Sequence, residues 1–351
     1  MSTAALVAFN LLLNGIGSFA IAWLLARAAV RLFRPAPGGA HLALLALPFL
    51  KVAFDLSRGV PGGSFLWLRA RGVPQDIGSF QVGFGISSWF VPKVQLALGA
   101  RSAGIEYTQS VPDLLAAFLM KRVSPWVVPA IAALLLSVAA VRLAARAVAW
   151  VRAARERREA GRRASLCGRR RAGRRSVTLL VSPDVDGSPF TGGILRPYNC
   201  FPARLWAALS PAERRAAIEH ELAHAAQHHV LLTTLAGIVR DLFWFVPFIG
   251  AAERRLREAC ELAADARAVQ RGTPPELLAS ALVRAREVMP PRAPARVATL
   301  AAGETSLLTR IDRLLDPPAP PRLGFQHRVP RVVLTLWLAA AVLTAVVFGN
   351  H

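Results

Sequence analysis

The chain has 351 residues, 54% of them hydrophobic, and a formal net charge of +22. Its mean hydropathy of +0.40 is too apolar for a soluble enzyme of this length. In so apolar a chain, a basic excess is more typical of cytoplasmic loops beside membrane spans than of nucleic-acid binding. The three cysteines are odd in number and fall in segments expected in the cytoplasm, which argues against a disulfide framework.

Four apolar segments are predicted as transmembrane helices, because about 20 apolar residues are needed to cross a bilayer. Residues 1–57 hold two of them, and the others fall in 124–151 and 331–351. Residues 58–123, between the second and third, are rich in Gly, Ser and Pro and predict an ordered extracytoplasmic loop with short strands. An amphipathic helix is expected near the end of this loop, from about Pro112 to Lys121.

Residues 152–175 form a dense arginine segment in which only Glu156 and Glu159 carry the opposite charge. The positive-inside rule places this segment in the cytoplasm, so the N-terminus and His351 are expected outside. We predict a basic cytoplasmic linker that contacts membrane lipids through their anionic headgroups. Specific nucleic-acid binding is not expected, because the segment lacks interleaved aromatic residues and any recognisable fold.

A globular domain is predicted over residues 176–316, followed by a Pro-rich linker over 317–330. Strands are expected at Val177–Ser182 and at about 193–202, and helices at about 211–235, 251–270, 275–288 and 306–315. The predicted fold class is therefore a multi-pass α-helical membrane protein with an inserted cytoplasmic α+β domain.

The helix expected at about 211–235 carries His220, Glu221 and His224 in an HExxH arrangement. Residues four apart lie on one face of a helix, so both imidazoles point to the same position. This pattern is typical of a zinc site with two histidine ligands, in which Glu221 acts as the general base for water. Ser210-Pro211-Ala212-Glu213 has the capping box and early proline that begin such a helix.

Zinc in such a site needs a third protein ligand and an open position for water. Glu258 and Glu261 lie three residues apart on the next helix, and their spacing alone does not separate them. Asp265, one turn beyond Glu261, is suitably placed to hold a ligand histidine from behind. This pairing favours Glu261 as the third ligand.

The apolar stretch Val230–Ala252 resembles a further span, but Arg240 and Asp241 lie at its middle, and such charges are costly in lipid. A span here would also place Glu261 on the opposite side of the membrane from the two histidines. We therefore expect this stretch to continue the motif helix and then turn, either buried against the domain or lying on the bilayer surface.

Several segments together resemble the BlaR/MecR family of membrane-anchored gluzincin peptidases. They are Pro189–Gly192, Arg196–Pro197, His220–His224, Trp244–Pro247, Glu261–Asp265 and Arg310–Leu315. The resemblance implies a cytoplasmic zinc protease domain of the gluzincin type, with His220, His224 and Glu261 as ligands and Glu221 as base. It also implies cleavage of the protein itself or of a transcriptional repressor when an outside signal arrives.

The sequence departs from this family in two respects. Five positions after the second histidine the family usually has an acidic residue, whereas this chain has His229. No penicillin-binding sensor domain is expected after the fourth span, so antibiotic sensing is not implied.

These features predict a zinc metalloendopeptidase of signal transduction, located in the inner membrane of a bacterial-type cell, that hydrolyses peptide bonds of a cytoplasmic protein. The strand at about Gly193–Asn199 is expected to pair with an extended peptide substrate. The alternative is a non-catalytic zinc-binding membrane signalling or scaffold protein. The intact Glu221 argues against it, because a structural zinc site has no use for a base at that position.

Overall fold

The computed structural model describes residues 3–59, 94–95, 108–109, 111–185, 188–289 and 307–316. The predicted linker at 317–330, the predicted fourth span and most of the predicted loop at 58–123 lie outside the described residues. Within that loop, β1 (Val94–Gln95) pairs with β2 (Thr108–Gln109). The helix expected at the end of the loop is confirmed as α5 (Val111–Arg122).

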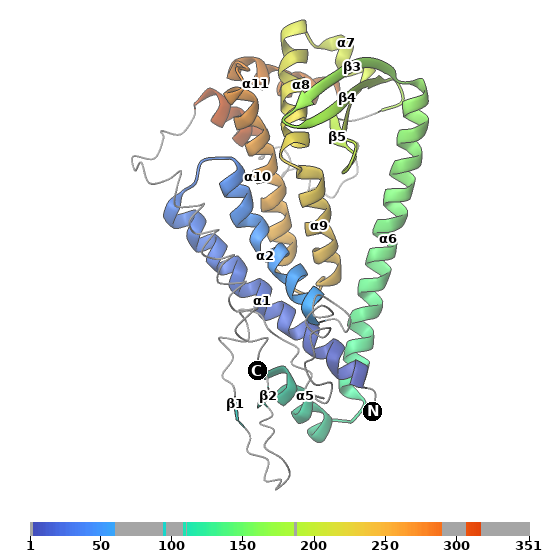
Figure 1. Ribbon diagram of the computed structural model, residues 1–351, viewed down its shortest axis with the longest axis vertical. Coiled ribbons are helices and arrows are strands. Elements are labelled where there is room, and N and C mark those ends of the chain that lie inside the picture. The colour runs from blue at the N-terminus through green and yellow to red at the C-terminus, as the bar shows by residue number, and fades with distance from the viewer. Residues whose placement is uncertain are drawn as a thin grey trace, which may run out of the picture.

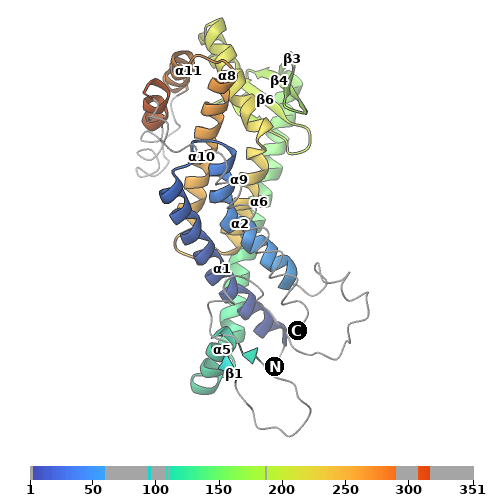
Figure 2. The same ribbon diagram turned by 60° about the vertical axis from the view of Figure 1, so that its left-hand side comes forward.

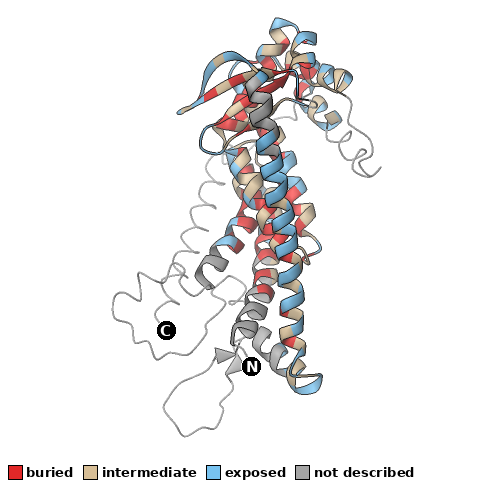
Figure 3. Ribbon diagram, turned by 90° about the vertical axis from the view of Figure 1, so that its right-hand side faces the viewer, coloured by how far each residue is buried: buried red, intermediate tan, exposed pale blue. Residues whose placement is uncertain are grey.

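Three long helices make up much of the elongated part of the molecule. α1 (Thr3–Phe33) and α2 (Gly39–Gly59) pack against each other, and α6 (Val127–Arg163) runs past α1 up to the sheet (Figure 1). Among the described residues, one stretch, Val127–Arg152 of α6, is long and apolar enough to cross a bilayer, and 17% of its most apolar part is buried. Much of its outer face is exposed (Figure 3). The structure therefore contains one candidate membrane span, in agreement with the third predicted span, whereas crossing by α1 and α2 stays a prediction.

A helical hairpin lies beside these helices. It consists of α9 (His229–Leu242) and α10 (Ile249–Gln270), with its turn at residues 243–248. Both views show it alongside α1 and α2, and apolar side chains from all four helices form one buried cluster (Figures 1 and 2). The Phe243 ring packs so closely on Gly15 that a Cβ there would collide with it. Because the chain turns back at 243–248, the hairpin begins and ends at the domain. His220 and His224, which precede the hairpin in the chain, and Glu261 on its second helix can therefore lie close together.

The structure corrects two details predicted for this stretch. The motif helix does not continue to about residue 235, because the chain breaks at 227–228, where His228 has a φ of 56°. The hairpin also does not lie against the domain alone. α10 packs on α8 of the domain, but the hairpin also packs on α2 and α6 and shares a buried apolar cluster with α1, because its apolar side chains find their partners there.

The charges at the middle of the stretch are neutralised inside this bundle. Asp241 is buried and lies 2.5 Å from Arg146 of α6 and 2.9 Å from Arg240. Arg240 also pairs with Glu253 of α10 at 2.7 Å. Gly237 has no side chain, and a Cβ there would run into the Arg146 guanidinium. Ion pairing between helices therefore offsets the cost of burying these charges.

The sheet has four strands in the order β3-β4-β6-β5, with β4 and β6 parallel and the other pairs antiparallel. The strands are β3 (Ser165–Ala172), β4 (Arg175–Ser182), β5 (Phe190–Gly192) and β6 (Tyr198–Pro202). β4 confirms the first predicted strand. The second predicted strand begins later than expected, as β6, because residues 193–197 form a loop in which Gly193 has a φ of 78°, and β5 precedes this loop.

The basic segment 152–175 was predicted to be a linker, and this prediction is wrong. α6 continues to Arg163, and β3 then pairs with β4 over most of its length. Gly173, at a φ of 64°, lets the two strands join through a tight turn. Most side chains of β3 are exposed, including its arginines. The sequence of β3 therefore lacks the alternation of apolar and polar residues that predicts a half-buried strand, and this is why the strand was not predicted.

The helix that carries the HExxH motif is α8 (Pro211–Ala226), and it lies between the sheet on one side and α10 and α11 (Pro275–Val288) on the other (Figure 1). Its predicted capping box is present, with the Ser210 hydroxyl accepting from the Glu213 amide at 3.3 Å. The short helix α7 (Ala203–Ala208) precedes it, and residues 307–315 form a further helix. α8 is thus held on two sides, which fixes the direction of its side chains.

Candidate metal centre

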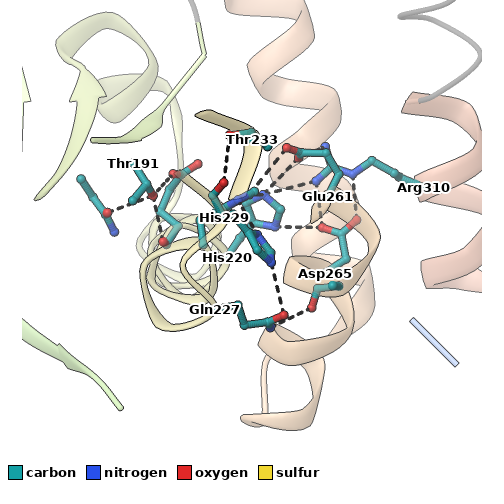
Figure 4. Close-up of polar contacts among 12 residues, drawn as sticks. Thr191, His220, Gln227, His229, Thr233, Glu261, Asp265 and Arg310 are labelled. Carbon is teal, nitrogen blue, oxygen red and sulfur yellow. Dashed lines mark hydrogen bonds and ion pairs between the residues drawn. The ribbon is translucent and has the colours of Figure 1, made fainter. Parts of the chain in front are cut away.

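Two helices bring three metal-binding side chains together. His220 and His224 lie one turn apart on α8, with 3.1 Å between their Nε2 atoms. Glu261 of α10 places one carboxylate oxygen 3.6 Å from His220 Nε2 and the other 3.7 Å from His224 Nε2. Figure 4 shows His220 and Glu261 facing each other from the two helices. The predicted trio is therefore brought together, with one potential ligand atom from each residue within 4.8 Å of the others.

These residues fit a zinc ion. Zinc bonds to nitrogen and oxygen are about 2.0–2.2 Å long, so neighbouring ligand atoms of a tetrahedral site are about 3.4 Å apart. The 3.1 Å between the two Nε2 atoms lies close to this value, and so do the 3.6 and 3.7 Å from them to the two different oxygens of the Glu261 carboxylate. With one ligand atom from each residue, all three lie within 4.8 Å of one another. Two imidazoles and one carboxylate also leave a fourth position for water, as catalytic zinc sites require. Glu258 is exposed on α10 and does not join the group.

Asp265 and Arg310 support two of these side chains from behind. Asp265 Oδ1 lies 2.9 Å from His220 Nδ1, a close contact that falls short of the alignment of a good hydrogen bond. Arg310, from the helix at 307–315, donates to both Asp265 oxygens, at 2.7 and 2.8 Å. Its Nη1 lies 3.0 Å from Glu261 Oε2. One guanidinium therefore contacts both carboxylates of α10.

The other ligand histidine has a different support. His224 Nδ1 lies 2.9 Å from Nδ1 of His229, the first residue of α9. His229 Nε2 in turn lies 3.3 Å from Gln227 Oε1, and the Gln227 amide donates to the carbonyl of Ala263 at 3.3 Å. This chain of contacts connects α8, the break after it, and α10.

Glu221 is buried, and β5 holds its carboxylate. The Thr191 hydroxyl lies 2.7 Å from Glu221 Oε2 and 2.9 Å from the Glu221 carbonyl oxygen. It also lies 3.1 Å from Asn199 Oδ1, and its single proton serves one of these acceptors at a time (Figure 4). The glutamate beside the two histidines therefore has a fixed orientation.

The electrostatics of the metal-free site place one proton on the ligands. Burial disfavours the charge of His220, but Asp265 and Glu261 outweigh it and raise the pKa of His220 to about 9. Burial dominates at His224 and lowers its pKa to about 4. Burial would raise the pKa of Glu261, yet the two histidines and Arg310 hold it well below its ordinary value. At neutral pH His220 is protonated, His224 is neutral and Glu261 is ionised.

The same surroundings act on the two neighbours of the ligands. Burial raises the pKa of Glu221 above its ordinary value, although His220 and the Thr191 hydrogen bond oppose the shift. Burial and the adjacent His224 lower the pKa of His229 to about 3. Glu221 is therefore a stronger base than an exposed glutamate, and His229 is neutral at pH 7.

Residues 108–314 match the family described as BlaR1 peptidase M56, over more than half of the chain. The chain belongs to this family. Proteins of the BlaR1 family are membrane-anchored, which agrees with the candidate span in α6. A search of curated proteins finds no match. The His220, His224 and Glu261 group is therefore the metal site of an M56 peptidase, and its composition is consistent with zinc.

A cleft of about 1050 Å³ opens over the site of this M56 peptidase. Phe190 and Thr191 of β5 line one part of it. Its apolar part is lined by Leu205, Leu209, Leu278, Ala281, Leu282 and Met289. The cleft-lining strand is thus β5 (Phe190–Gly192), the last strand of the sheet, and not the stretch at about 193–199 that the sequence suggested, because residues 193–197 turn away as a loop.

Sequence reasoning assigned no role to two residues of the site, Thr191 and Arg310. Each contacts a predicted site residue that is distant in the sequence. Thr191 is 30 residues from Glu221, and Arg310 is 45 residues from Asp265. Their one signal in the sequence was membership of two segments that resemble the M56 peptidases, Pro189–Gly192 and Arg310–Leu315.

Proposed function

We propose that this M56 metallopeptidase is a membrane-anchored zinc endopeptidase that hydrolyses a peptide bond of a cytoplasmic protein, either its own chain or a regulator, in signal transduction. The observation that carries the proposal is the buried Glu221, held by Thr191 beside the metal-binding histidines and at the wall of a large cleft. The cytoplasmic location of the cleft rests on the basic residues that follow the span in α6.

The chemistry follows from the roles of these residues. His220, His224 and Glu261 would hold a zinc ion, which would supply Lewis-acid polarisation of the scissile carbonyl and would lower the pKa of a bound water molecule. Glu221 accepts a proton from the attacking water and delivers it to the leaving amine. Thr191 holds Oε2 of Glu221 at 2.7 Å, so Oε1 is left for the water. The raised pKa of Glu221 suits a group that first takes and then returns a proton near neutral pH.

The substrate is an extended peptide. β5 is an edge strand of the sheet and lines the cleft, so a peptide that adds to this edge by main-chain hydrogen bonds runs past Glu221. The apolar part of the cleft, which includes Leu205 and Leu278, then receives an apolar side chain of that peptide. Main-chain pairing explains how different sequences are accepted, and the apolar part supplies selectivity.

A non-catalytic zinc-binding signalling or scaffold protein is the alternative function. Burying a carboxylate costs free energy unless it is paired and hydrogen-bonded, and the Thr191 hydroxyl satisfies only part of the Glu221 carboxylate. A structural zinc site needs neither a fixed base nor an open cleft, whereas this site has both. The alternative therefore leaves the position of Glu221 without an explanation.

Glu221→Gln in the full-length protein tests the proposal. The variant keeps its zinc but loses peptide cleavage by about 10²–10⁴-fold, because the amide does not accept the proton. Mass spectrometry of cells that express wild-type protein or the variant identifies fragments that depend on Glu221, and metal analysis of the purified proteins checks the zinc. Glu219→Gln is the matched control, since Glu219 pairs with Arg271 at 2.8 Å outside the site. Equal fragments from both variants would show that the protein is not a protease of this kind.

A further inference from the structure

His224 uses one ring nitrogen at the metal site, and this determines what its other nitrogen does. Nε2 faces His220 and Glu261, at 3.1 and 3.7 Å, so it is the nitrogen that binds a metal. An imidazole bound through Nε2 carries its proton on Nδ1 and needs an acceptor there. The one neighbour of His224 Nδ1 with a hydrogen-bonding distance in the described structure is Nδ1 of His229, at 2.9 Å.

The position of His229 results from the break between α8 and α9. His228 adopts a left-handed conformation with a φ of 56°, which ends α8 and starts α9 in a new direction. His229, five residues after His224, is thereby turned back onto the ligand, with 4.8 Å between the ring centroids and an angle of 82° between the rings. His229 is 2% exposed, so water does not compete for this contact.

The remaining contacts fix the direction of each hydrogen bond. If His224 donates from Nδ1, then His229 accepts at Nδ1 and carries its own proton on Nε2. That nitrogen lies 3.3 Å from Gln227 Oε1, which is an acceptor, and the Gln227 amide donates to the Ala263 carbonyl at 3.3 Å. The chain ends on a backbone carbonyl of α10, two residues from Glu261. Each donor in this series of hydrogen bonds has an acceptor only when His229 is neutral and protonated on Nε2.

We propose that His229 is a positioning residue: as a neutral acceptor, it holds the ligand His224 in the tautomer and orientation that bind zinc through Nε2. The proposal rests on the assignment of His224 as a zinc ligand under the proposed function, but it does not depend on peptide cleavage. A neutral acceptor orients the ring without adding negative charge, whereas a carboxylate at the same place would also make His224 more basic.

Variants of His229 separate the acceptor from the ring. His229→Phe keeps the ring volume but removes the acceptor, and His229→Leu does so with a smaller side chain. His229→Asn replaces the ring by an amide whose oxygen lies near the position of Nδ1. The zinc dissociation constant of the full-length, detergent-solubilised protein, measured by chelator competition without substrate, is expected to rise by about 10–100-fold in the two variants without an acceptor. The Asn variant is expected to recover most of this loss.

Two further measurements complete the test. His229→Asp supplies a charged acceptor and is expected to bind zinc at least as tightly as the wild type. The cobalt-substituted Phe and Leu variants should show altered visible absorption, because His224 is free to turn. His228→Asn is the matched control: the residue is exposed, its left-handed backbone suits Asn, and zinc binding should not change.

The outcomes distinguish this inference from the proposed function. A wild-type protein that binds no zinc contradicts the proposed function itself. A wild-type protein that binds zinc no more tightly than the folded Phe and Leu variants contradicts the role of His229 alone. Loss of zinc in the Asn and Asp variants equal to that in Phe and Leu would also overturn it, since the ring and not the acceptor would then be required.

Discussion

Arg310 and Asp265, 45 residues apart in the sequence, form a buried ion pair through two hydrogen bonds of 2.7 and 2.8 Å. Asp265 contacts the ligand His220, and the same guanidinium contacts the ligand Glu261 at 3.0 Å. The helix at 307–315 is thus attached to the metal site through one side chain. In the metal-free protein this guanidinium offsets the negative charge of both carboxylates.

Arg310→Ala is therefore expected to destabilise the metal-free protein by about 3–5 kcal/mol, because it leaves a buried carboxylate without its partner. Zinc should stabilise this variant more than it stabilises the wild type, since the ion replaces the lost positive charge. Melting temperatures with zinc and with a chelator measure both effects. Arg313→Ala, an exposed position on the same helix, is the control, and equal metal-free melting temperatures for the two variants would contradict the prediction.

The third ligand is tested by a pair of glutamates on α10. Glu261→Ala is expected to abolish stoichiometric zinc binding, because Glu261 supplies the carboxylate between the two histidines. Glu258→Ala is the matched control and should keep its zinc, since Glu258 is exposed. Asp265→Ala is expected to weaken zinc binding by about 10–100-fold through the loss of support for His220. Metal content of the purified proteins decides, and a zinc-free Glu258→Ala protein beside a zinc-loaded Glu261→Ala protein would reverse the assignment.

Zinc binding should depend on pH with a sign that follows from His220. Its pKa is raised to about 9 and that of His224 is lowered to about 4, while Glu261 stays ionised, so near neutral pH zinc displaces one proton, from His220. Apparent zinc affinity is therefore expected to rise about tenfold per pH unit between about pH 6 and pH 8. Chelator competition over this range measures the slope, and calorimetry in two buffers counts the protons released. An affinity independent of pH over this range would contradict the proton assignment.

A native cysteine reports the predicted topology. Cys167 is exposed on β3, whereas Cys200 and Cys260 are buried. With the domain in the cytoplasm, a membrane-impermeant maleimide should not label intact cells but should label Cys167 after permeabilisation. Cys167→Ser removes the signal and is the control. A cysteine at Ser2, which is expected outside, should react in intact cells, whereas labelling of Cys167 in intact cells would place the domain outside.

Local sequence was sufficient for the part of the site that fits within one helical turn. The four-residue spacing of His220 and His224 places them on one face of α8, and the capping box at Ser210 and Glu213 begins that helix. The helices α5 and α11 were predicted for the same reason, since their boundaries depend on nearby residues. Asp265 could be expected behind a ligand because it lies one turn from Glu261.

Tertiary packing decided what local sequence left open. Glu258 and Glu261 are both on α10, and only the packing of that helix against α8 and α2 determines which of them faces the histidines. The contacts of Arg310 with Asp265, of Thr191 with Glu221 and of β4 with β6 all join segments that are separate in the chain.

The motif of this protein was thus determined by its sequence, because the geometry of a helical turn follows from adjacent residues. The spacing of Glu261 and Asp265 favoured the third ligand, but the contacts of Arg310, Thr191 and His229 and the course of the α9–α10 hairpin were decided only by the folded structure. The physical reason is that each of them depends on burial and hydrogen bonding between side chains of different elements, and no local pattern records which elements meet.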